Sequence, residues 1–214
     1  FDKGKFLEIS MFIFCQIQLL GQNGYKLWLD YQKLDENIIA TEYSFISGIH
    51  LLNDKNDEIL NTTKNILTEH LSTLLGKKII SENNQKAGQI SLSIDPDAVN
   101  INAEGFKITS TSNALKIDAK TSKGLLYGAY HLINKLHRKE KIKNINIIES
   151  PKIQNRILNH WDNLDRTVER GYAGFSLWDW HKLPGYIDPR YKDYARANAS
   201  VGINGTVLTN VNAN

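Results

Sequence analysis

The order of predicted elements after Pro151 constrains the fold of this chain more than any other feature of its sequence. Residues 155–159 (NRILN) predict a short strand, residues 189–201 predict a helix, and residues 204–210 (NGTVLTN) predict a second buried strand. Two strands joined through a helix run parallel, because an antiparallel pair needs only a short turn. The sequence therefore predicts a β–α–β unit.

Units of this kind build (β/α)₈ (TIM) barrels, in which the active site forms from the loops that follow the strands' C-terminal ends. The loop starting at His160 and the segment Asn210–Asn214 both follow a predicted strand. We expect residues 151–214 to be the start of such a barrel. A barrel that stops after its second strand cannot close, so we interpret the chain as a piece of a longer protein.

Residues 23–150 predict a separate α/β sandwich domain, in which two helices pack on one sheet. The spacing of apolar residues predicts helices over 54–76 and 121–138. Strands are predicted over 25–31, 78–80, 89–94, 105–109, 113–119 and 142–148. Gly124 and Gly128 lie four positions apart in the second helix and favour close packing of that helix on the sheet.

Residues 1–22 have the basic-then-apolar order of a secretory signal peptide. The apolar run, Met11–Leu20, is too short to cross a bilayer as a helix, which takes roughly 20 residues. A signal remnant, a lipoprotein-type anchor at Cys15 and an artefactual extension are three open interpretations of this segment. A signal would place the protein in an extracellular or periplasmic location. Cys15 is the only cysteine, which excludes an internal disulfide.

Composition and charge limit the partners of the chain. Apolar residues make up 41% and charged residues 23%, which are ordinary values for a globular protein. The net charge of +3 comes mostly from scattered lysines, whereas nucleic-acid-binding proteins gather basic residues on one face. His131 and His137 are six positions apart on one predicted helix, which is not ligand spacing. We therefore expect no nucleic-acid partner, no metal and no cofactor.

The stretch Asn155–Trp180 combines aromatic rings with fixed charge. It holds three of the four tryptophans, several carboxylates and the arginines Arg166 and Arg170. Rings that stack over a ligand, with charged groups around them, suit recognition of a polar ring-shaped molecule such as a sugar. This density predicts a carbohydrate site.

Four stretches resemble the α-glucuronidases of glycoside hydrolase family 67. LNHWDNLDRTVERGYAGFSLW is similar to the family's first barrel strand and loop, and YARANASVGINGTVLTNVNAN to its second strand. GYKLWLDY and SKGLLYGAYHLI are similar to parts of its N-terminal domain, so the likeness spans about residues 24–214. Arg166 stands where the family usually has glycine, and Phe175 and Ala213 also vary.

The resemblance implies an enzyme of xylan breakdown that releases (4-O-methyl)glucuronic acid, α-1,2-linked to xylo-oligosaccharides. The family inverts configuration: one carboxylic acid protonates the leaving oxygen, and carboxylates roughly 6.5–9.5 Å away activate water. The family's catalytic acid and base lie beyond Asn214, so we expect this chain alone to be inactive. A homodimer is a further expectation for the complete protein.

The resemblance also implies substrate-binding residues. Trp161 matches the family tryptophan that packs against the uronic acid, and Val211 matches a residue of the apolar sheath around the 4-O-methyl group. His160 and Asp162 flank Trp161; they either bond sugar hydroxyls or fix the loop.

Asp165, Glu169 and Arg170 are better candidates for a charge network that stiffens the loop than for an acid/base pair. Asp162 and Asp165 sit on one loop, whereas inversion needs groups on opposite faces of the sugar. Trp178 and Trp180 either line a xylose subsite or form a packed base of the loop.

Two other functions stay open at this point. The chain could be a non-catalytic carbohydrate-binding module, because it holds rings and polar groups without a proven acid/base pair. It could also be another hydrolase with the same two-domain plan, such as a hexosaminidase-type enzyme, whose N-terminal domain looks like the hexosaminidase-domain-2-like residues 23–150. The motif NHWDNLD argues against that reading.

Overall fold

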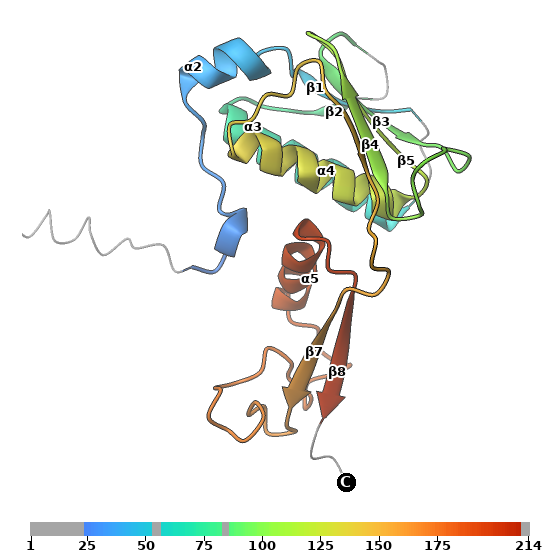
Figure 1. Cartoon of the computed structure of the whole chain (residues 1–214). Coiled ribbons are helices and arrows are strands. Elements are labelled where there is room, and N and C mark those ends of the chain that lie inside the picture. Colours follow the sequence, from blue (N-terminus) through green and yellow to red (C-terminus); the bar gives the residue numbers. More distant parts are fainter. Residues whose placement is uncertain (1–23, 53–56, 83–85, 211–214) are drawn as a thin grey trace, which may run out of the picture. The chain divides into compact units, whose positions relative to one another are not determined.

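The computed structural model describes residues 24–52, 57–82 and 86–210 of the chain, which divides into two compact units. The described residues of the first unit, which ends at Asp30, form a 3₁₀ turn, η1 (Leu27–Leu29). The second unit begins at Tyr31 and contains the large sheet and the β–α–β unit (Figure 1). The predicted leader, residues 1–22, lies outside the described residues.

The strand predicted over residues 25–31 is wrong. Gly24 and Leu27 have φ values of +70° and +53°, and the Leu27 N–H donates to the Gly24 carbonyl at 3.1 Å. A tight turn of this hand cannot continue as an extended strand. Tyr31 is instead a buried residue of the second unit, with its ring edge-on to those of His70 and His137.

The second unit has a six-stranded mixed sheet in the order β2-β1-β3-β5-β4-β6. β2, β1, β3 and β5 run parallel, and β4 is antiparallel to β5 and β6. The strands are β1 (Gly48–Leu51), β2 (Ser81–Glu82), β3 (Gln89–Ile94), β4 (Phe106–Ser110), β5 (Leu115–Ala119) and β6 (Asn146–Glu149).

Four of the predicted strands match β3, β4, β5 and β6 to within a few residues. The strand predicted at 78–80 is irregular and leads into β2. β1 was not predicted, because all four of its residues are buried and GIHL shows no alternation.

Two short helical turns precede β1, and two long helices cover the sheet. The turns are α2 (Glu36–Ile38) and the π-helical η2 (Ile39–Tyr43), and the long helices are α3 (Glu58–Leu75) and α4 (Ser122–His137). Both long helices were predicted from their apolar spacing. Asp57 caps α3 by accepting from the N–H groups of Ile59 and Leu60, and Gly76 ends it at φ +61°.

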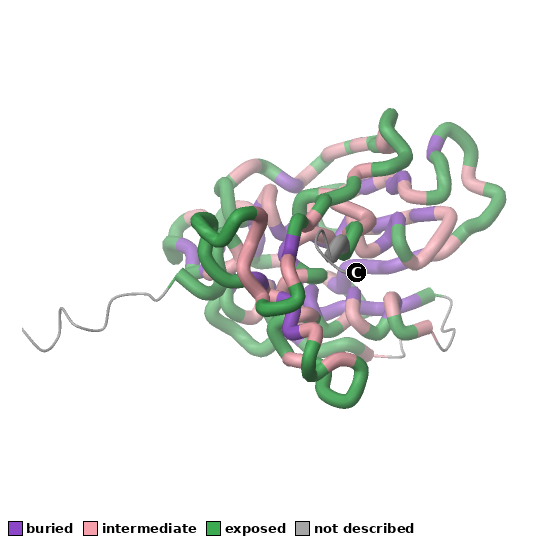
Figure 2. Tube along the Cα trace, turned by 90° about the horizontal axis from the view of Figure 1, so that it is seen from below, coloured by how far each residue is buried: buried purple, intermediate pink, exposed green. Residues whose placement is uncertain are grey.

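The core lies between the sheet and these two helices, where buried residues recur along the strands and helices (Figure 2). Leu67 and Leu71 of α3, Leu132 of α4, and Ile90 and Ile117 of the sheet are fully buried. Each side chain of this kind stabilises the fold by roughly 1.5–3 kcal/mol when it leaves water. In the described part of the chain, no helix combines the length and apolar character that a membrane span requires.

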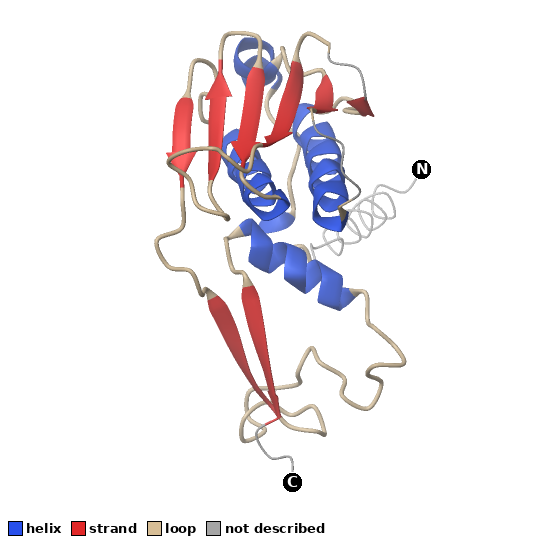
Figure 3. Ribbon diagram, turned by 90° about the vertical axis from the view of Figure 1, so that its right-hand side faces the viewer, coloured by secondary structure: helices blue, strands red, loops and turns tan. Residues whose placement is uncertain are grey.

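Glycines let α4 approach the sheet closely, as their spacing indicated. Figures 1 and 3 show α3 and α4 side by side on one face of the sheet. A Cβ added at Gly124 would lie 2.3 Å from the carbonyl oxygen of Gly105, and one at Gly128 would lie 2.7 Å from Cγ2 of Ile117. Neither position has room for a side chain.

The β–α–β unit is formed as predicted, by β7 (Ile157–Asp162), α5 (Arg190–Ser200) and β8 (Gly205–Asn210). β7 and β8 pair in parallel, with Ile157 opposite Gly205 and Asp162 opposite Asn210. The sheet of the N-terminal region and this unit together confirm the α/β class. The domain boundary at residue 150 stays a prediction.

Polar contacts join the start of this unit to the turn before β4. Arg156 Nη2 donates to Glu104 Oε2 at 2.6 Å, and Asn204 Nδ2 donates to both Glu104 oxygens at 3.1 and 3.2 Å. Burial raises the pKa of Glu104, but the hydrogen bonds from Arg156 and Asn204 and the charge of Arg156 outweigh it, so the pKa is lowered overall.

Gly124→Ala tests the packing of α4. The added Cβ meets backbone, so we expect the free energy of unfolding to fall by about 1–3 kcal/mol even though alanine favours helix. Urea unfolding measures the change. Gly185→Ala is the matched control, because its Cβ would meet only the carbonyl oxygen of Lys182 at 3.6 Å. A Gly124→Ala protein as stable as the control would contradict the close approach.

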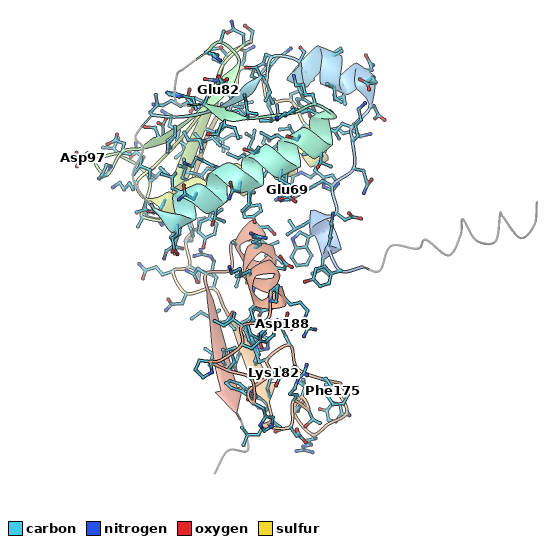
Figure 4. The ribbon with its side chains drawn as sticks, turned by 180° about the vertical axis from the view of Figure 1, so that it is seen from behind. Glu69, Glu82, Asp97, Phe175, Lys182 and Asp188 are labelled. Carbon is cyan, nitrogen blue, oxygen red and sulfur yellow. The ribbon has the colours of Figure 1, made fainter. Side chains whose placement is uncertain are left out.

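Glu104→Gln tests the junction with β7. At pH 7 we expect a loss of about 2 kcal/mol, because Arg156 loses its charged partner. Because the pKa of Glu104 is lower in the folded than in the unfolded state, its ionised carboxylate stabilises the folded protein at pH values above the unfolded-state pKa. That stabilisation is lost as the pH falls through the folded-state pKa. The difference between wild type and variant should therefore shrink below about pH 4 in urea unfolding. Glu69→Gln, on the exposed side of α3 (Figure 4), should be nearly neutral at pH 7.

Candidate functional site

The candidate site lies at the C-terminal ends of β7 and β8. β7 extends through His160 to Asp162, so these residues belong to the strand end, whereas the sequence placed His160 at the start of the loop. Side chains alternate along a strand, so Trp161 lies on the face opposite to His160 and Asp162. His160 contacts α5, which places Trp161 on the face away from that helix. Trp161 is 52% exposed.

His160 is held against α5. Its Nε2 lies 2.6 Å from the hydroxyl of Tyr194, and its Nδ1 lies 4.0 Å from Oδ2 of Asp162. Its ring packs edge-on to the rings of Tyr194 and Trp178, with centroid distances of 5.5 and 5.8 Å. The imidazole is therefore fixed on three sides by protein groups.

Asp162 is buried, with only 1% of its surface exposed. Ser176 Oγ donates to Asp162 Oδ2 at 2.5 Å and accepts from the N–H of Trp178 at 2.9 Å. These contacts favour the loop-fixing interpretation of His160 and Asp162, and their role toward a sugar stays a prediction.

The loop folds back onto the end of β7. The Glu169 N–H donates to the Trp161 carbonyl at 2.7 Å, and Val168 forms a bridge with Asp162. Asn163 Nδ2 donates to the Glu169 carbonyl at 2.8 Å. The strand end and the first turn of the loop are thus one hydrogen-bonded piece.

The prediction that Asp165, Glu169 and Arg170 form a charge network is wrong. Asp165 accepts from the Thr167 hydroxyl and N–H at 2.7 and 2.9 Å, and these two bonds hold the pKa of Asp165 below its usual value. Glu169 accepts from the Tyr172 hydroxyl at 2.7 Å. Among the residues that the structure describes, Asp165, Glu169 and Arg170 form no ion pair.

Arg166 and Asp179 carry the charge contacts of the loop. Arg166 Nη1 lies 3.4 Å from Asp179 Oδ2, and its Nη2 donates to the Ser176 carbonyl at 3.1 Å. Lys182, labelled in Figure 4, lies 3.2 Å from the same Asp179 oxygen. Burial raises the pKa of Asp179, but the hydrogen bond and charge of Lys182 and the charge of Arg166 outweigh it and lower that pKa.

Arg166 has a φ of +72°, a conformation that suits glycine. Glycine, which the motif resemblance gives the family at this position, would adopt this φ without strain. Arg166 retains the strained backbone while its side chain bonds two later parts of the loop.

Trp178 forms a packed base for the loop. It is 8% exposed and packs against Tyr191 and Tyr194 of α5, with centroid distances of 4.6 and 5.6 Å. Of the two interpretations of Trp178, the contacts favour packing over a xylose subsite. Trp180 is partly buried, and Phe175, at 79% exposed, lies on the outside of the loop (Figure 4).

Sequence reasoning missed Tyr194 and Ser176, the partners of His160 and Asp162. A tyrosine in a predicted helix and a serine in a loop carry no signal by themselves. Val211 lies outside the described residues. In the ranges 24–52, 57–82 and 86–210, no group of three or more potential ligand side chains could hold a metal.

Comparison with protein families identifies the chain. Residues 27–132 match the model of the glycosyl hydrolase family 67 N-terminus, and residues 135–214 match that of the family 67 middle domain. The chain belongs to glycosyl hydrolase family 67. Family 67 membership confirms the resemblance seen in the motifs and excludes the hexosaminidase-type alternative.

Two curated relatives are both named "probable alpha-glucuronidase A". A "probable alpha-glucuronidase A" of Aspergillus oryzae is 26% identical over 224 residues, which cover 98% of this chain and 26% of the relative. One of Aspergillus terreus is 37% identical over 121 residues, covering 55% of this chain and 14% of the relative. The family 67 chain thus spans about a quarter of the length of the A. oryzae relative.

A solved structure shows a similar fold. A GH138 enzyme that targets pectin rhamnogalacturonan II has a TM-score of 0.54 and 16% identity, over 77% of this chain and 19% of that one. At this identity, the likeness concerns the fold alone.

Arg166→Ala and Arg166→Gly test the strain in the loop. Both variants lose the contacts with Asp179 and Ser176, but alanine keeps a Cβ at φ +72°. We expect the glycine variant of the complete protein to be more stable by about 1 kcal/mol in urea unfolding. At Lys182, where φ is not positive, the alanine variant should be more stable than the glycine variant. The same order at both positions would argue against strain at Arg166.

Proposed function

We propose that this chain is part of an α-glucuronidase of xylan breakdown that releases (4-O-methyl)glucuronic acid, α-1,2-linked to xylo-oligosaccharides. The observation that carries the proposal is the half-exposed Trp161 at the C-terminal end of β7, in a chain of family 67. An exposed indole offers a flat apolar face on which a sugar ring can stack. The names of the curated relatives support the same activity.

The proposed setting of Trp161 is a (β/α)₈ barrel that begins with β7, α5 and β8. Strands of parallel sheets are covered on both faces, yet apolar residues of this pair are exposed. Ile157, Leu158, Val207 and Leu208 are 38–47% exposed. Further strands and helices of the complete protein would cover them. Trp161 would then lie at the end of the barrel where active sites form.

We propose that this chain contributes to substrate binding rather than to cleavage of the glycosidic bond. Asp162 is buried against Ser176, and Asp165 is bonded to Thr167, so neither carboxylate is placed to move a proton at a sugar oxygen. Inversion needs two carboxyl groups on opposite sides of the glycosidic bond. We assign them to later parts of the complete protein.

Three further proposals rest on the sequence alone. They are the apolar contact of Val211 with the 4-O-methyl group, export to an extracellular or periplasmic location, and a homodimer of the complete protein.

Trp161→Ala tests the function in the complete protein. We expect kcat/KM for release of 4-O-methylglucuronic acid from aldouronic acids to fall roughly 10–200-fold, because an apolar contact with the uronic acid is lost. Trp28→Ala is the matched control, since Trp28 is 49% exposed but belongs to the first unit. Unchanged kcat/KM in Trp161→Ala would refute the binding role.

A non-catalytic carbohydrate-binding protein is the second candidate, because the described residues contain a ring platform but no acid/base pair. The same assay separates the two functions. A complete wild-type protein that binds aldouronic acids but releases no uronic acid would support the second candidate.

A further inference from the structure

The orientation of Trp161 is set from the opposite face of β7. Its two neighbours, His160 and Asp162, point away from it and are both anchored. A side chain that is exposed has few contacts of its own to hold it. The direction of the indole therefore depends on how firmly the backbone of this strand end is fixed.

One anchor comes from α5. The Tyr194 hydroxyl lies 2.6 Å from His160 Nε2, and the two rings also pack against each other. α5 itself is tied to the loop, because the Tyr191 hydroxyl accepts from the N–H of Asp179 at 2.9 Å. The helix thus fixes the residue before Trp161.

The other anchor comes from the loop. Ser176 is 5% exposed and its hydroxyl is used twice, as donor to Asp162 and as acceptor from Trp178. A serine in this place satisfies both a buried carboxylate and a buried N–H. The loop thus fixes the residue after Trp161, and the Glu169 N–H fixes the carbonyl of Trp161 itself.

We propose that Tyr194 and Ser176 are positioning residues for substrate binding, which act through His160 and Asp162 on the direction of the Trp161 indole. This inference rests on the proposed function. Stacking on a sugar ring is made in the ground state and in the transition state alike. Loss of the right direction should therefore raise KM and leave kcat nearly unchanged.

The test is a double-mutant cycle in the complete protein, with aldouronic acid as substrate. We expect Tyr194→Phe and Ser176→Ala each to raise KM roughly 3–10-fold, with kcat changed less than about twofold. In a Trp161→Ala background, neither substitution should raise KM further, because contacts that act through one group are not additive. Tyr186→Phe, an exposed tyrosine of the loop, should leave both constants unchanged.

The cycle distinguishes positioning from general stability. A smaller folded fraction would lower apparent kcat without raising KM, so a fall in kcat alone would overturn the proposal. An equal rise of KM with and without Trp161 would overturn it as well. The proposed function fails on a different result, a complete wild-type protein that releases no uronic acid. Unchanged kcat/KM in Trp161→Ala would refute the binding role of Trp161 and overturn the positioning proposal with it.

Discussion

The contact of Arg156 with Glu104 ties the start of the β–α–β unit to the turn before β4. A guanidinium presents five N–H donors in one rigid plane, so it can fix several segments at once. Arg156 donates to the carbonyls of Gly202 and Ile153 at 2.5 and 2.6 Å as well as to Glu104. The backbone N–H of Arg156 donates to Asn204 Oδ1 at 2.9 Å. The starts of β7 and β8 are thereby anchored, while their other ends carry the candidate site.

The sequence predicted those parts of the fold that follow from local rules. Apolar spacing and a glycine stop located α3, and the strand–helix–strand order located the parallel pair. The end of β7 was missed because His160, Trp161 and Asp162 were assigned to the tryptophan-rich loop that follows the strand. The partners of His160 and Asp162 could not be predicted, since Tyr194 is 34 positions from His160 and Ser176 is 14 positions from Asp162. Only the folded chain shows which hydroxyl reaches which group.

The path of the loop after β7 is set by the backbone conformation of a few residues more than by contacts between charged side chains. Arg166, Glu169, Gly171 and Gly174 all have positive φ, so the chain turns sharply several times within nine residues. The dense charge in this stretch suggested a network of carboxylates and arginines. Asp165 and Glu169 instead bond to neighbouring hydroxyls, and Arg166, in a glycine-like conformation, reaches Asp179 later in the loop.

The parallel pair β7–β8 also affects how this stretch of chain behaves on its own. In the described part of the chain this sheet has two strands, so each strand has one edge that no third strand pairs, and the loop covers only the end of β7, through the Glu169 N–H and the Trp161 carbonyl. Apolar side chains of the same two strands are also exposed. Such edges are templates for strand addition from other molecules. Expressed in isolation, this segment is therefore prone to aggregate through the same surface that packing in a larger sheet would protect.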